Sequence, residues 1–362
     1  MTTLIAADIA RLLARTPSLW EPLRGASLFI SGGTGFFGTW LLEAVLAANR
    51  AQSLDCRVLL LSRDPDRFTA KVPHLARDPA VSFIEGDVRS FRFPDTPVTH
   101  VIHAATEASG SLNASDPQTM FDTCVDGTRR MLLFAQQNRC QRFLFTSSGA
   151  VYGRQPPDLS HTPEDFYGGP NPLDTRNAYA EGKRAAELLC AVAARSSSEA
   201  GLHLSIARCF AFVGPHLPLD AHFAIGNFIR DSIAGGPIRI GGDGTPLRSY
   251  LYAADLAEWL FTILLHGETG RAYNVGSEEA VSIRQLADRV ADVATRVWPD
   301  RGRPEIVMAQ QPLPGQPSER YVPDCRRSRE ELGLVPATSL DESIRLTMLA
   351  HLKEQPTPGS PQ

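Results

Sequence analysis

A phenol and an ammonium group lie four residues apart in the segment YAEGK, residues 179–183. In a helix this spacing places Tyr179 and Lys183 on the same face, one turn apart. A free phenol has a pKa near ~10 and is a poor base at neutral pH, but a neighbouring cation favours its ionised form. Ser148, which ends the apolar run RFLFTSS, can share a hydrogen bond with the same substrate oxygen. These three side chains are suited to moving a proton to or from an alcohol or a ketone.

Glycines are concentrated in the segment SGGTGFFG, residues 31–38, between the apolar run ASLFI and the helix-forming segment TWLLEAVLAANR. Gly33, Gly35 and Gly38 have the spacing G-x-G-x-x-G, and Gly32 extends it. After a strand and before a helix, such a loop lets the backbone and the helix N-terminus approach a pyrophosphate. The sequence therefore predicts a dinucleotide site that includes Gly32, Gly35, Phe36, Phe37 and Gly38.

The end of the second predicted strand should contact the adenosine ribose of that dinucleotide. A carboxylate there indicates NAD, whereas a basic residue accommodates the 2′-phosphate of NADP. The sequence LLLSRDPDRF puts Ser62 and Arg63 at this place, and Arg63 favours NADP, although a shift of one residue would present Asp64 instead. Both cofactors therefore remain open. Asp87 and Val88, at the end of the third predicted strand, are placed to flank the adenine.

Apolar runs that alternate with helical segments predict the elements that position these groups. The expected strands are residues 26–30, 57–61, 81–86, 98–105, 142–148 and 202–210. Because the runs are continuous rather than alternating, the strands should be buried on both faces. The pattern predicts an α/β fold with a Rossmann-type, doubly wound parallel sheet.

The composition of the sequence changes after about residue 206, where Pro and Gly become frequent and the expected strands become shorter. We expect an N-terminal helical extension (1–25), an NAD(P)-binding Rossmann domain (26–205) and a smaller C-terminal substrate-binding lobe (206–350). The chain should partly return to the first domain around 250–275, and residues 351–362 form a polar, Pro-rich tail that we expect to be frayed. The smaller lobe should pack over the carboxyl ends of the strands.

Composition favours small-molecule partners. The formal net charge is −4, with 36 Lys and Arg against 40 Asp and Glu, which indicates neither a nucleic-acid surface nor a polybasic membrane anchor. The 6 cysteines show no C-x-x-C pair, so we expect no metal site and no disulfides. Neither a signal peptide nor a run of 18 apolar residues is apparent, and we expect a cytoplasmic protein.

These motifs together resemble those of the extended short-chain dehydrogenase/reductases, in the nucleotide-sugar epimerase/dehydratase group. The resemblance covers roughly residues 26–350, through GGTGFFG, GDV, HAAT, TSSGAVYG, YAEGK, RCFAFVGP, GDGTPLRSYLYAADLA, YNVGS and RYVPD. It implies that Ser148, Tyr179 and Lys183 form the catalytic triad, with Tyr179 as general acid/base and Lys183 also holding the nicotinamide ribose. It also implies that the cofactor is lined by the segment from His103 through Ala104, Ala105 and Thr106.

The resemblance also implies a nucleotide-diphosphate sugar as substrate. Arg248 is similar to an arginine that binds the diphosphate, with Tyr250 beside it, and Arg320 is similar to a second phosphate-facing arginine. Ser148 and Gly149 would lie against the sugar. A homodimer through two long helices of the first domain, including the one that carries Tyr179, is expected from the resemblance alone.

The residues after Ser148 discriminate between reactions of the family. Its 4,6-dehydratases have Asp and Glu where this chain has Gly149 and Ala150, and its decarboxylating members keep a Glu in the place of Ala150. Elimination needs a second proton-transfer group, which neither residue can supply. We therefore expect a nucleotide-sugar epimerase, acting at C4 with a recycled NAD(P), with small residues that give the sugar ring room beside the nicotinamide.

Two alternatives remain open. One is an NADPH-dependent 4-ketoreductase of an NDP-4-keto-6-deoxysugar, and the other is a non-catalytic dinucleotide-binding regulator, against which the intact triad argues. The chain departs from the family at Cys124 and Ala211, where asparagines are usual. His222 and Asn227 fall where family members line the substrate cleft and are weak candidates for replacing the second of these asparagines.

Overall fold

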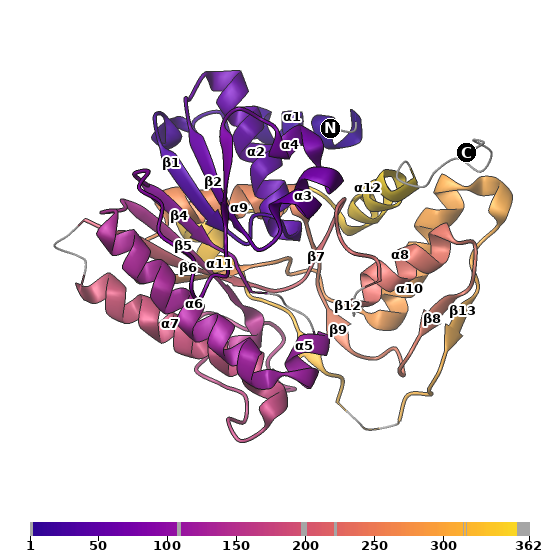
Figure 1. Cartoon of the computed structure of the whole chain (residues 1–362). Helices are drawn as coiled ribbons and strands as arrows, with labels where there is room; N and C mark the ends of the chain where they lie inside the picture. Colours follow the sequence, from indigo (N-terminus) through magenta and orange to yellow (C-terminus); the bar gives the residue numbers. More distant parts are fainter. Residues whose placement is uncertain are drawn as a thin grey trace.

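The computed structural model describes residues 3–106, 110–196, 201–220, 223–313, 315 and 317–352. Its main element is a seven-stranded sheet in the order β11-β6-β5-β4-β1-β2-β3, in which every pair of neighbours is parallel. The strands are β1 (Ser27–Ser31), β2 (Arg57–Ser62), β3 (Val81–Glu85), β4 (His100–His103), β5 (Arg142–Ser148), β6 (His203–Cys209) and β11 (Ala272–Val275). The predicted doubly wound parallel sheet is thus confirmed (Figure 1).

Helices cover both faces of this sheet (Figure 1). Successive strand residues point to opposite faces, so Leu28 and Ile30 belong to one apolar cluster and Phe29 to the other. The first cluster includes side chains of α1 (Thr3–Arg15), α2 (Phe36–Gln52) and α9 (Ala253–His266), with α3 (Pro65–Lys71) and α4 (Pro73–Ala76) at its edge. The second includes side chains of α6 (Pro117–Gln137) and α7 (Ala178–Ser196).

Helix α1 is part of the first lobe. Leu12 is fully buried in the first cluster, and Arg15 forms ion pairs with Asp255 and Glu258 of α9. Asp8 accepts a hydrogen bond from Tyr252, the residue before α9. The N-terminal helix therefore completes the cover of this face of the sheet.

The smaller lobe has its own apolar cluster, formed mainly by α8 (Ala224–Ile233), α10 (Ile283–Val297) and α12 (Leu340–Leu352). Figure 1 shows these helices to one side of the sheet. Short strands pair around them, and these are β7 (Phe212–Val213) with β10 (Leu251–Tyr252), β8 (Ile238–Ile240) with β13 (Ile306–Met308), and β9 (Leu247–Arg248) between β12 (Val281–Ser282) and β14 (Arg320–Tyr321).

The chain crosses between the lobes more than once. Helix α9 and strand β11 lie in the first lobe, as does α11 (Arg326–Leu332), which packs against both. Short helices complete the inventory of the described residues, namely α5 (Gly110–Ser115), η1 (Glu21–Leu23), η2 (Gly149–Tyr152), η3 (Thr175–Asn177) and η4 (Pro299–Arg301). His222 and the tail from residue 353 lie outside the described residues.

Three further observations concern the cysteines, the lengths of the helices and metal-binding side chains. All six cysteines lie in the described ranges, where each is buried and none forms a disulfide. Among the helices that the structure describes, none is long and apolar enough to cross a membrane. Within the same ranges, no cluster of His, Cys, Asp and Glu could hold a metal ion.

Candidate active site

The carboxyl end of β5 and the first turns of α7 bring Ser148, Tyr179 and Lys183 together. Lys183 is 3% exposed, and its Nζ donates a hydrogen bond to the carbonyl oxygen of Thr146 at 2.7 Å. The same ammonium lies 4.8 Å from the centre of the Phe145 ring and 5.9 Å from that of Tyr179. A buried cation needs such partners, and here they fix the helix against the strand that ends in Ser148.

The electrostatics of Tyr179 set the conditions under which it can act. Burial raises the pKa of the Tyr179 phenol, and a hydrogen bond from Ser148 lowers it in part. Burial also lowers the pKa of Lys183. The phenol is therefore protonated until further positive charge arrives beside it, as the oxidised nicotinamide ring would provide.

The N-terminus of α7 is anchored by a residue that the sequence did not single out. Asn113 of α5 accepts a hydrogen bond from the backbone N–H of Tyr179 at 3.0 Å and donates one to the carbonyl of Arg176 at 2.6 Å. This amide ties the start of the catalytic helix to the segment before α6. No spacing in the sequence indicates this contact.

A second phenol lies at Ser148. The hydroxyl of Tyr321, from β14, is 3.4 Å from the Ser148 hydroxyl and 3.5 Å from the carbonyl oxygen of Cys209. Its ring lies 4.7 Å from the ring of Phe210. Sequence reasoning selected Arg320 from the motif RYVPD and missed Tyr321, because only the pairing of β14 with β9 brings this tyrosine to the strand ends.

The space beside Gly149 is filled. A Cβ at this position would lie 2.8 Å from two ring atoms of Phe210 and 2.8 Å from the hydroxyl oxygen of Tyr321. The expected free room for a sugar ring on this side of Gly149 is therefore absent. Gly149 is needed because two aromatic side chains close against its backbone.

The glycine-rich loop joins β1 to α2. Gly32 has φ +73°, and a Cβ there would lie 2.5 Å from the carbonyl oxygen of Ala104. Gly35 is exposed, directly precedes α2 and leaves the first amides of that helix without a side-chain cap. Phe36 and Phe37 pack against the first apolar cluster, and Gly38 is buried. A glycine-rich loop that is exposed at Gly35, at an uncapped helix N-terminus, fits a pyrophosphate.

The end of β2 decides which residue is presented to the ribose. Strand β2 ends at Ser62, whose hydroxyl accepts a hydrogen bond from the backbone N–H of Asp64 at 3.1 Å. Asp64 in turn caps α3 by accepting from the N–H of Arg67 at 2.9 Å. Arg63 is exposed between them. The carboxylate of Asp64 is thus engaged by the helix, and Arg63 is the charged residue that directly follows the strand.

In the sheet, the ends of β3 and β4 lie on either side of the ends of β1 and β2. Asp87 accepts hydrogen bonds from the N–H and the guanidinium of Arg89, which lower the pKa of its carboxyl, and Val88 is buried. The backbone N–H groups of Ala104 and Ala105 donate to Ser31, and Thr106 follows. All the candidate cofactor residues therefore lie at the carboxyl edge of the sheet, around the switch point between β1 and β4.

His103 is a structural residue. Its ring nitrogens lie 2.7 Å from the hydroxyl of Ser31 and 3.0 Å from that of Thr128, and burial lowers its pKa to about 3. It is therefore neutral and does not line the cofactor site.

The candidate phosphate residues are separated by strand register. Arg248 is paired with Tyr321, whereas Arg320 is paired with Leu247. Because side chains alternate along a strand, Arg248 shares a face with Tyr321, and Arg320 points to the opposite face. The guanidinium of Arg248 also lies 3.7 Å from the carboxylate of Glu319. The structure brings Arg248 to the site and does not place Arg320 beside it.

The other candidate residues are buried or form hydrogen bonds with neighbouring residues. Tyr250 is 8% exposed within the lobe's apolar cluster, and burial raises its pKa. Asn227, on α8, accepts a hydrogen bond from Arg230 at 3.1 Å. Ala211 accepts one at its carbonyl oxygen from the N–H of Leu251. Cys124 is fully buried against Gly182 of α7, close to Lys183.

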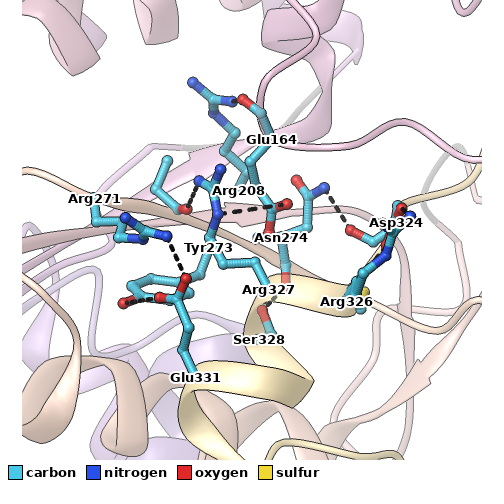
Figure 2. A network of polar contacts seen from close by, with 12 residues as sticks. Glu164, Arg208, Arg271, Tyr273, Asn274, Asp324, Arg326, Arg327, Ser328 and Glu331 are labelled. Carbon is cyan, nitrogen blue, oxygen red and sulfur yellow. Dashed lines mark hydrogen bonds and ion pairs between the residues drawn. The ribbon is translucent and has the colours of Figure 1, made fainter.

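A buried polar network holds the segment that carries Tyr321. Asn274 of β11 donates to the carbonyl oxygens of Thr162 and Asp324 at 2.8 and 2.9 Å, and accepts from the hydroxyl of Tyr152 at 2.8 Å. Figure 2 shows Asn274 between Asp324 and Arg208. The network thus connects the chain just after β14 to the first lobe.

The same network extends to the end of β5, the strand that carries Ser148. Arg208 of β6 forms an ion pair with Glu187 of α7 at 2.7 Å and donates to the carbonyl of Glu164 at 3.0 Å. Glu187 also accepts a hydrogen bond from Ser147, the neighbour of Ser148. Removing one member of this network leaves a largely buried charge unpaired, so the network positions the end of β5.

Comparisons with known proteins agree with this geometry. The model described as "NAD dependent epimerase/dehydratase family" matches residues 28–276. The chain is 29% identical over 339 residues to UDP-glucuronic acid decarboxylase 6 of Arabidopsis thaliana, and the match covers 92% of each chain. The resemblance stated from the motifs is thereby confirmed.

Solved structures give the same fold. The UDP-glucose 4-epimerase of Thermus thermophilus in complex with NAD has a TM-score of 0.69 at 26% identity, covering 90% of this chain and 98% of that one. DesIV of Streptomyces venezuelae, a dTDP-glucose 4,6-dehydratase with NAD and TYD bound, has a TM-score of 0.73 at 24% identity, covering 90% and 97%.

The close contacts at Gly149 give a stability prediction. Gly149→Ala should lower the free energy of unfolding by about 1–3 kcal/mol, because the new methyl group overlaps Phe210 and Tyr321. Gly241→Ala is the matched control, since a Cβ there meets nothing within 4 Å, and it should change stability by less than about 0.5 kcal/mol. Urea denaturation of both variants would check this, and equal stability of the two would contradict the packing described.

Proposed function

Because the chain belongs to the NAD-dependent epimerase/dehydratase family, we propose that it is a nucleotide-sugar epimerase that acts at C4 of the sugar with a bound nicotinamide dinucleotide. The observation that carries this proposal is the end of β5. Gly149 and Ala150 follow Ser148 there without a carboxylate, and Phe210 and Tyr321 close the space beside Gly149. Tyr179 can transfer one proton, which is sufficient for C4 epimerisation. Elimination of water would need a second proton-transfer group.

The chain's own residues supply binding and proton transfer. The loop from Gly32 to Gly38 would hold the pyrophosphate, and Lys183 the nicotinamide ribose. When bound, a nicotinamide dinucleotide would supply the hydride acceptor and donor that C4 epimerisation requires. Tyr179, ionised beside Lys183, takes the proton of the C4 hydroxyl as the C–H bond breaks and gives it back to the ketone oxygen. Ser148 donates a hydrogen bond to that oxygen, and Arg248 would bind the diphosphate.

A 4-ketoreductase is the second candidate, and the arrangement after β2 favours it. Arg63 directly follows the strand, while Asp64 caps α3. A guanidinium at that place suits the 2′-phosphate of NADP, the cofactor that a reductase would use once per turnover and exchange. UDP-glucuronic acid belongs in the substrate panel as well, because the curated relative named above is a decarboxylase of that sugar.

The state of the cofactor separates the two candidates. We expect protein purified without added nucleotide and then denatured to release close to one equivalent of NAD per chain, because an epimerase regenerates its cofactor at every turnover. Mass spectrometry of the released nucleotide would give its identity and occupancy. An empty protein that binds NADPH reversibly would contradict the epimerase and support the reductase.

Tyr179 gives the direct test of the chemistry. Tyr179→Phe should lower kcat by about 10²- to 10⁴-fold, with the dinucleotide still bound, because only the transferable proton is removed. Tyr167→Phe is the control, since Tyr167 is 92% exposed, and should keep wild-type turnover. Turnover of Tyr179→Phe within tenfold of wild type on a panel of UDP- and dTDP-sugars would contradict the assignment.

We also propose a homodimer through α6 and α7. Apolar side chains stand exposed on these helices, among them Leu188 (66% exposed), Val192 (58%) and Leu133 (45%). A second copy of the chain would cover them. Leu188→Asp should convert a dimer to a monomer in sedimentation velocity, whereas Val335→Asp, at a 55% exposed residue elsewhere, should not. A monomeric wild type, or a dimeric Leu188→Asp, would contradict this interface.

A further inference from the structure

Among the contacts described above, Tyr321 is the residue of the second lobe that reaches the end of β5, where Ser148 lies. Its hydroxyl lies 3.4 Å from the hydroxyl of Ser148, although 173 positions separate the two residues. Tyr321 is half-buried as a residue, as is Tyr179. Ser148 therefore has one phenol from each lobe beside it.

Hydrogen-bond capacity decides what the Tyr321 hydroxyl does to Ser148. A serine hydroxyl can accept two hydrogen bonds and donate one. The Ser148 oxygen accepts from the backbone N–H of Ala150 at 3.2 Å. The Tyr321 hydroxyl has one proton and two acceptors within reach, the Ser148 oxygen at 3.4 Å and the carbonyl oxygen of Cys209 at 3.5 Å. When Tyr321 donates to Ser148, the single proton of Ser148 is left for Tyr179 or for the substrate oxygen.

We propose that Tyr321 is a positioning residue of the active site, which donates a hydrogen bond to Ser148 and so directs the Ser148 proton to the reacting oxygen. This proposal rests on the proposed function, because it concerns the oxygen on which Tyr179 acts. It adds a residue from the substrate-binding lobe to the set that controls proton transfer.

The surroundings hold Tyr321 in place. Its ring is tilted by 40° against that of Phe210, with the ring centres 4.7 Å apart. The next residue, Val322, donates its N–H to Gln155 at 3.2 Å and accepts at its carbonyl from the N–H of Thr162 at 2.9 Å. These bonds fix the backbone next to Tyr321, and the contact with Phe210 restricts its ring, so the hydroxyl is held near Ser148.

Burial keeps the Tyr321 hydroxyl protonated, so that it has a proton to donate. Burial raises the pKa of Tyr321 to about 12, and the nearby charge of Arg248 offsets only part of this effect. Tyr321 therefore keeps its proton throughout the physiological range. Burial raises the pKa of Tyr179 as well, so the two phenols differ by their position rather than by their pKa. The buried ammonium of Lys183 lies 5.9 Å from the centre of the Tyr179 ring, and we therefore assign proton transfer to Tyr179 and orientation to Tyr321.

The test is Tyr321→Phe, which removes one oxygen and keeps the ring that packs on Phe210. In NAD-loaded protein, the absorbance titration of Tyr179, identified by its loss in Tyr179→Phe, should shift upward by about half a pH unit or more, because Ser148 favours the phenolate less. The groups that face Tyr179 in this titration are Ser148, Tyr321, Cys124, Cys209 and Lys183.

The same variant should slow hydride transfer from UDP-glucose or dTDP-glucose to bound NAD, followed by the absorbance of the reduced nicotinamide. We expect a decrease in kcat of about tenfold with KM within about twofold, because the hydroxyl acts on the reacting oxygen rather than on the diphosphate. Tyr273→Phe is the matched control, since it removes a buried phenol's hydrogen bond to Glu331 away from the site. It should change neither readout.

The outcomes separate this proposal from the proposed function. An unshifted titration in Tyr321→Phe overturns the positioning role, whatever the sugar reaction shows, as does an increase in kcat, which would mean that Ser148 donates to Tyr321. A shifted titration with no hydride transfer from any sugar in the wild type supports the position of Tyr321 and overturns the proposed function.

Discussion

The buried ammonium of Lys183, bound to the carbonyl oxygen of Thr146, fixes α7 to the end of β5. Loss of this contact would leave a buried cation without a partner and would destabilise the fold. The contact therefore sets the register of the helix against the strand. Glu187, one turn further along α7, binds Ser147 and Arg208 and repeats the attachment on the next strand. The distance between Ser148 and Tyr179 follows from these two fixed points.

The chain after β14 is attached to the first lobe by hydrogen bonds from a buried amide side chain. Asn274 joins β11 to the carbonyls of Thr162 and Asp324, so the residues that follow β14 are part of the first lobe's polar core. Arg248 and Tyr321 then share one face of the small sheet. The group that would bind the diphosphate and the group that contacts Ser148 are consequently held in fixed relation to each other.

Local pattern was sufficient for the fold and for part of the site. Apolar runs predicted the parallel sheet, and the spacing of Tyr179 and Lys183 predicted their common helix face. Tyr321 could not be predicted, because its contact with Ser148 depends on a pairing between two-residue strands far apart in the chain. Strand register likewise decides that Arg320 points away from Arg248. To decide between Arg63 and Asp64, one must know the residue at which β2 ends. To recognise that His103 is structural, one must know the buried hydroxyl groups on either side of its ring.

The close packing at Gly149 also bears on how this chain could have evolved. Phe210 and Tyr321 occupy the volume into which any side chain at position 149 would extend. A mutation that introduces a carboxylate there lowers the stability unless one of the two aromatic side chains shifts or becomes smaller. The order of substitutions therefore matters, because an earlier change at Phe210 or Tyr321 would remove much of that loss.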